Sequence, residues 1–156
     1  MLFYVALLSL ALLAVIETLL IMVRSYGSLR SAQHIERDAG IVLERMLREA
    51  RDAQDIDDAG SVFGSSPGEL LLTTTDASGT ARTVEFYVEN GQVKLKEDGL
   101  LSGALTGTKT SVSALVFRKI TTGRSKGVKI ELHLSGSGTP SREENFYGTA
   151  VLRDSY

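Results

Sequence analysis

An uninterrupted apolar stretch opens the chain, and no other feature restricts the fold as strongly. Between Met1 and Val23 the only charged residue is Glu17, and Arg24 ends the run. Leu, Ala and Met, which favour helix, dominate it. A helix that crosses about 30 Å of hydrocarbon needs roughly 20 apolar residues, and in lipid only a helix or a closed barrel satisfies its own backbone. The run therefore predicts a membrane-spanning helix over residues 1–23.

Two other kinds of segment contain such a run: a buried helix of a soluble protein and a cleaved signal peptide. Signal peptides begin with a basic region and combine a short apolar core with a small-x-small cleavage site. Here no Lys or Arg precedes Arg24, the apolar run is longer than such a core, and no clean cleavage site follows it. We therefore expect an anchor that is retained.

Glu17 lies inside this span, where a charged carboxylate costs about 2.5–3.5 kcal/mol on insertion scales. Two interpretations remain open. Glu17 contacts a neighbouring chain within the membrane, which would make it an intersubunit residue. Alternatively, it is tolerated as a neutral or snorkelling side chain some two turns from Arg24.

Residues 24–56 continue the helix as an amphipathic stalk. Charged residues cover one face, and Glu44 and Arg48 form a favourable i,i+4 pair. Gly27 and Gly40 predict bending or partial melting, since each weakens a helix by about 1 kcal/mol relative to Ala. The helix is expected to end between residues 55 and 60. The other face is apolar, with residues spaced by three or four that we expect to pack on a globular domain: Ala32, Ile35, Ala39, Val42, Leu43, Met46, Leu47, Ala50, Ala53 and Ile56.

Four aspartates lie near the expected end of the stalk: Asp52, Asp55, Asp57 and Asp58. The helix dipole disfavours negative charge at a C-terminus. A calcium site would explain the cluster because carboxylate oxygens are calcium ligands. A solvated, frayed helix end explains it as well, and the spacing does not match an EF-hand loop.

Residues 57–156 read as a small sheet domain, because short β-rich runs alternate with turn residues. Asn90-Gly91 predicts a type I′ hairpin turn, in which Val88 pairs with Val93 and Phe86 with Leu95 on a buried face. The connections are too short for crossover helices, so the sheet is expected to be mostly antiparallel. With one face on the stalk, the fold class is α+β in two layers. Strands are expected at residues 69–75, 83–89, 92–96, 112–120, 128–134 and 145–152.

The composition argues against several function classes. The net charge of −2 and the lack of a basic stripe with aromatics do not suggest nucleic-acid binding. The chain has no Cys, so disulfides and thiolate metal sites are excluded. Gly64-Ser65-Ser66-Pro67-Gly68 matches a nucleophile-elbow pattern, but a strand is expected after it where that motif needs a helix. His34 and His133 are expected to be solvated single residues. We therefore predict no enzyme, and no catalytic, cofactor or metal residue.

The order of an apolar helix, an amphipathic stalk and a Gly-rich sheet domain resembles type IV pilins and type II secretion pseudopilins. The stalk segment 35–53 is similar to that of minor pseudopilins, and residues 1–13 look like the part of the family signature that follows its glutamate. The resemblance implies a filament subunit that polymerises through its apolar helix. Its partners would be other pilin-like subunits, the lipid bilayer and an inner-membrane assembly machinery. It would be a single-pass protein with an extracytoplasmic sheet domain before assembly into a periplasmic or cell-surface filament.

One departure from the family concerns the start of the chain. The family's basic leader, Gly cleavage site and Glu-containing motif do not precede Met1, so we expect the sequence to be truncated. Glu17 lies too far along to replace the missing Glu. Arg24, Arg30 and Arg37 follow the span, which by the positive-inside rule places the C-terminus in the cytoplasm unless a basic leader is missing. The alternative function is a single-span, membrane-anchored extracytoplasmic binding or sensor domain.

Overall fold

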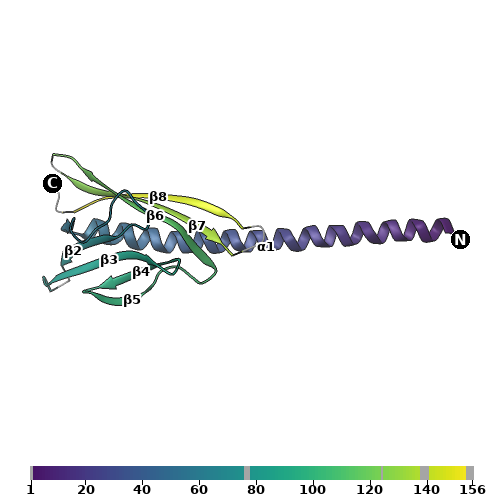
Figure 1. Cartoon of the computed structure of the whole chain (residues 1–156), viewed down its shortest axis with the longest axis horizontal. Coiled ribbons are helices and arrows are strands. Elements are labelled where there is room, and N and C mark those ends of the chain that lie inside the picture. Colours follow the sequence, from purple (N-terminus) through teal and green to yellow (C-terminus); the bar gives the residue numbers. More distant parts are fainter. Residues whose placement is uncertain (1, 76–77, 124, 138–140, 154–156) are drawn as a thin grey trace.

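The computed structural model describes residues 2–75, 78–123, 125–137 and 141–153. One helix, α1 (Leu2–Asp52), forms a rod of about 77 Å at 1.5 Å per residue (Figure 1). The helix is continuous through Gly27 and Gly40, so the partial melting expected there does not occur. A single glycine costs only about 1 kcal/mol, which the hydrogen-bonded turns on either side outweigh.

The remaining described residues form two antiparallel sheets beside the second half of α1, while the first half projects beyond them (Figure 1). The arrangement confirms the predicted α+β class. The first sheet has five strands in sequential order: β1 (Asp55–Ile56), β2 (Leu70–Thr75), β3 (Ala81–Glu89), β4 (Gln92–Glu97) and β5 (Leu100–Ala104). The second has three, also in sequential order: β6 (Thr110–Thr121), β7 (Lys126–Gly136) and β8 (Glu143–Val151).

The division into two sheets differs from the single sheet expected from the sequence. Both arrangements bury the same alternating residues, so the strand pattern cannot distinguish them. β5 was also missed, because its run contains Ser and Gly and buries little. It forms the outer edge of the five-stranded sheet, with Leu100 and Leu101 exposed. β6 then starts the second sheet, and α1 packs mainly against β7 and β8.

The predicted hairpin between β3 and β4 is confirmed. Val88 lies opposite Val93 and Phe86 opposite Leu95 in the register. Asn90 has φ 54° and Gly91 φ 71°, the positive values that a type I′ turn requires. Phe86 and Leu95 are buried, so the face that the alternation assigned to the core is the one that packs inward.

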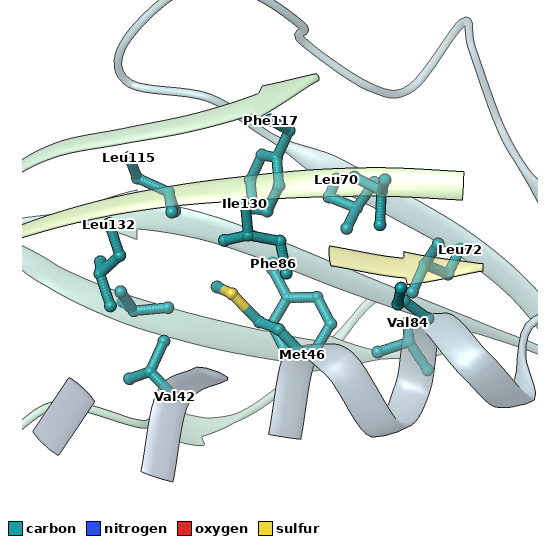
Figure 2. Packing of buried hydrophobic residues seen from close by; sticks show 14 of the residues in the cluster. Val42, Met46, Leu70, Leu72, Val84, Phe86, Leu115, Phe117, Ile130 and Leu132 are labelled. Atoms are coloured by element: carbon teal, nitrogen blue, oxygen red, sulfur yellow. The ribbon is translucent and has the colours of Figure 1, made fainter. Parts of the chain in front are cut away.

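One hydrophobic core joins the stalk to both sheets. Every predicted stripe residue is buried or partly buried. Figure 2 shows Val42 and Met46 of α1 beneath Phe86 of β3, with Ile130 and Phe117 of the other sheet on the far side. The stripe therefore anchors the helix to the domain, as its spacing predicted.

The helix ends at Asp52, three residues before the predicted end. Pairing with β2 replaces the last turn: Gln54 N donates to Thr73 O at 2.9 Å, and Asp57 N donates to Leu71 O at 3.0 Å. The Thr74 hydroxyl also donates to the Asp52 carbonyl at 3.1 Å, which satisfies one free carbonyl of the helix end. Long-range strand pairing thus ends the helix where the local sequence would allow it to continue.

The charged face of the stalk also differs from the prediction. In the described chain the i,i+4 ion pair joins Arg45 to Glu49, not Glu44 to Arg48. Glu49, expected on the solvent face, is buried. Its Oε2 lies 2.9 Å from Arg82 Nη2 of β3, and Arg45 Nη2 lies 2.8 Å from Glu97 Oε1 of β4. The first sheet covers this part of the polar face, so the charges face each other across the helix–sheet contact.

Candidate functional site

The first half of α1 presents apolar side chains on all sides. The large apolar residues between Phe3 and Val23 are all exposed, and Leu8 keeps 73 % of its surface. None of the most apolar 18-residue window is buried in the molecule, and the helix is long and apolar enough to cross a membrane. A helix that is apolar all round is suited to lipid or to a bundle of other helices. This surface is the candidate functional site.

Two of the polar side chains within this surface are satisfied by the helix itself. The Ser9 hydroxyl donates to the Val5 carbonyl at 2.8 Å, and the Thr18 hydroxyl donates to the Ala14 carbonyl at 2.7 Å. Such bonds to the preceding turn remove the need for water around a buried hydroxyl. Both residues are thus compatible with an apolar environment.

Glu17 differs from these two residues. It is exposed, and within the described chain its carboxylate has no hydrogen bond or ion pair. Arg24, the next charged residue, is equally unpaired there. Seven residues are close to two turns at 3.6 residues per turn, so Glu17 and Arg24 lie on nearly the same face of α1. A carboxylate that stays charged in an apolar environment needs a partner, which here must come from outside the described chain.

Three of the four aspartates near the helix end have separate partners. Asp55 Oδ1 lies 2.7 Å from Lys126 Nζ, and this hydrogen bond is the main reason that the pKa of Asp55 is lowered. Asp58 lies 2.6 Å from Lys119 Nζ, and Asp57 accepts the N–H of Ala59 at 2.9 Å. No group of three or more His, Asp or Glu side chains in the described ranges is arranged to hold a metal ion.

The other residues with potential chemistry lie apart from one another. Ser66 sits in the loop before β2, where its hydroxyl accepts the N–H of Leu115 at 3.2 Å, and a strand rather than a helix follows. His133 is half-buried on the face of β7 that points away from the core, beside the Tyr147 ring. His34 is half-buried on α1.

A pH-sensitive charge cluster lies on β6 and β7. Glu131 Oε1 lies 2.9 Å from both Arg118 Nε and Lys129 Nζ, and hydrogen bonds from these residues, Arg118 first, lower the pKa of Glu131 from 4.5 to about 2. A lowered folded-state pKa stabilises the fold above the unfolded value, and this contribution is lost as the pH falls through the folded value. The contribution of this cluster to the stability of the fold should therefore decrease progressively as the pH falls from about 4.5 to about 2.

A carbon-13 NMR titration of the Glu131 carboxyl, in the full chain in detergent micelles, measures this directly. We expect a midpoint near pH 2, and the Arg118→Gln variant should raise it because Arg118 makes the largest contribution. A midpoint near 4.5 in the unaltered chain would contradict the prediction.

Sequence reasoning missed a basic pocket where α1 leaves the sheets. Arg30 and His34 are four residues apart, a spacing that places them on one helix face and could have been noticed. Lys109 completes the lining, but only the register of β6 brings it there. The pocket is therefore a product of the tertiary fold.

No family model, curated protein or solved structure matches this chain.

Proposed function

We propose that this protein is a structural subunit of a type IV pilus or of a pseudopilus of the type II secretion kind. One observation carries the proposal: a single continuous helix is bare and apolar in its first half and built into a sheet domain in its second. The bare half would lie in the membrane before assembly and pack against other such helices in the filament afterwards. The sheet domain would then face outward.

The rigid attachment of the helix to the sheet domain supports these separate roles of the two halves. The α1 stripe shares one core with both sheets, and ion pairs join Arg45 and Glu49 to the strands beside them. Because the helix and the domain are fastened along several turns, a displacement of the apolar half would move the domain with it. A subunit drawn from a membrane into a filament needs this kind of coupling.

Glu17 and Arg24 suggest how neighbouring copies align. In two parallel helices shifted by seven residues, about 10.5 Å, Glu17 of one copy meets Arg24 of the next. The shift pairs two charges that otherwise stay unpaired in the described chain, and it follows the preference for paired ionisable groups inside membranes. We therefore propose Glu17 as an intersubunit residue.

Disulfide cross-linking in membranes tests this alignment, and the absence of Cys means that no background thiol interferes. Leu13→Cys and Leu20→Cys lie on the Glu17 face and are also seven residues apart. We expect a mixture of the two variants to cross-link, whereas each variant alone should not. Val15→Cys and Met22→Cys, a pair with the same spacing on the opposite face, serve as the matched control and should cross-link far less.

The possible cross-linking results test the proposed seven-residue shift and the proposed filament function separately. Leu13–Leu13 cross-links would mean unshifted helices, and would remove the role of Glu17 while keeping self-assembly. A protein that stays monomeric in bilayers, with no cross-link at any position, would overturn the filament proposal. That result would favour the alternative, a single-span anchored binding or sensor domain.

A further inference from the structure

The basic pocket lies where α1 emerges from between the sheets towards its bare half. It has a volume of about 260 Å³. Two of its lining residues are hydrogen-bonded to each other, since Ser137 N, just after β7, donates to the carbonyl of Lys109, just before β6, at 3.1 Å. The lining residues are Gly27, Arg30, Ser31, His34, Lys109 and Ser137.

The pocket carries uncompensated positive charge. Within the described ranges neither Arg30 nor Lys109 has an ion-pair partner, and His34 adds a third nitrogen-bearing side chain. Asp38, one turn beyond His34, accepts the N–H of Gly107 at 3.0 Å. The side chains that line the pocket are thus donors or cations, and none of them is a carboxylate.

A buried hydroxyl in the lining also lacks an acceptor. Ser31 is only 7 % exposed, and its Oγ has no hydrogen-bond partner among the described residues. It lies against Gly136 so closely that a Cβ there would be 2.1 Å away, which only glycine avoids. Buried hydroxyl groups normally find partners, because leaving one unsatisfied costs about 1–3 kcal/mol.

We propose that this pocket binds a phosphate group, and that the phosphate belongs to an anionic phospholipid of the membrane that α1 enters. Two cations and one unpartnered hydroxyl suit phosphate oxygens. Arg30 follows Arg24 by six residues, about 9 Å along the helix, while the headgroup layer extends roughly 5–7 Å beyond the hydrocarbon. Helix side chains lean towards the N-terminus, so Arg30 and His34 point back towards that layer.

This inference rests on the membrane part of the proposed function and goes beyond it. A lipid held at the pocket would fix the sheet domain against the membrane surface until the subunit is extracted. The positive charge adds attraction to an anionic leaflet, which is also strongest near the surface.

Native mass spectrometry of the full chain, released from vesicles of phosphatidylcholine with or without phosphatidylglycerol, tests the proposal. We expect retained phosphatidylglycerol in preference to phosphatidylcholine. The double variant Arg30→Gln, Lys109→Gln should reduce retention on the order of tenfold. Arg37→Gln, on the same helix but outside the lining, is the matched control and should retain the lipid.

Ser31→Ala guards against a folding artefact. The hydroxyl has no partner in the described chain, so its removal should not lower the urea stability, whereas lipid retention should fall. Equal retention of the two lipids, or no effect of the double variant, would overturn the proposal. Binding of inorganic phosphate at the pocket with no lipid retained would show that the phosphate group does not come from a phospholipid. A cross-link from Lys109 to an acidic residue of a second copy, with no lipid retained, would also contradict the phospholipid as the ligand. The cysteine experiment is independent of these outcomes, so failure of the filament proposal would be seen separately.

Discussion

Replacing Phe86 with alanine should lower the free energy of unfolding by about 3–5 kcal/mol, the largest effect we expect for a single residue. Phe86 is fully buried in β3, opposite Leu70 on one neighbouring strand and Leu95 on the other. Figure 2 shows its ring beside Met46 of α1. Its loss would leave a cavity at the junction of helix and sheet, where neither rigid element can collapse to fill the space.

Pulse proteolysis of the full chain in detergent micelles across a urea series measures this change. The matched control is Leu100→Ala in β5, where the side chain is 76 % exposed and the expected change is within about 0.5 kcal/mol. A loss of less than about 1 kcal/mol for Phe86→Ala would mean that the helix–sheet core is not packed as described.

Replacing Glu49 with alanine should cost about 2–3 kcal/mol, the second largest effect. The Glu49 side chain is 8 % exposed and lies 2.9 Å from both Arg45 and Arg82. Its removal leaves two guanidinium groups facing each other at the helix–sheet contact, with only Glu97 to balance them. Much of the cost comes from these unpaired charges rather than from the lost contact itself.

Two comparisons separate this explanation from a simple loss of packing. Glu49→Gln keeps the shape but not the charge, and should lose a large part of the same stability. Glu131→Ala, which removes ion pairs to Arg118 and Lys129 on the face of β7 that points away from the core, should cost less stability than Glu49→Ala. In a double-mutant cycle, Arg82→Met should make the Glu49→Ala change less costly. Additive effects of the two substitutions would show that Glu49 and Arg82 are not coupled.

The local pattern of the chain was sufficient to predict several features. The spacing of Ile35, Ala39, Val42 and Met46 identified the buried face of the helix, because one helix face repeats every three or four residues. Asn90-Gly91 predicted the turn and register of the β3–β4 hairpin, because few residues adopt two successive positive φ values. Glu17 was recognised as the single charge of the apolar run, although its role stays a prediction.

Other features depend on residues far apart in the sequence. The burial of Glu49 depends on Arg82 in β3, and the pocket at Arg30 depends on Lys109 beside β6. The local sequence around each residue does not reveal its partner. A charged residue on the polar face of a helix gives the same sequence pattern whether water or another charged residue covers it. The strand at Asp55, which ends the helix early, likewise needs β2 as its partner.

The sequence by itself determined the long helix, its apolar and amphipathic halves and the α+β class, because hydrophobic periodicity and turn chemistry act over a few residues. Only the tertiary structure decided that the strands divide into two sheets and that the helix ends at Asp52. It also decided that cations and the unpartnered Ser31 hydroxyl meet where the helix leaves the domain. Those outcomes follow from which segments pair and pack across long sequence distances, and alternative pairings bury the same alternating residues.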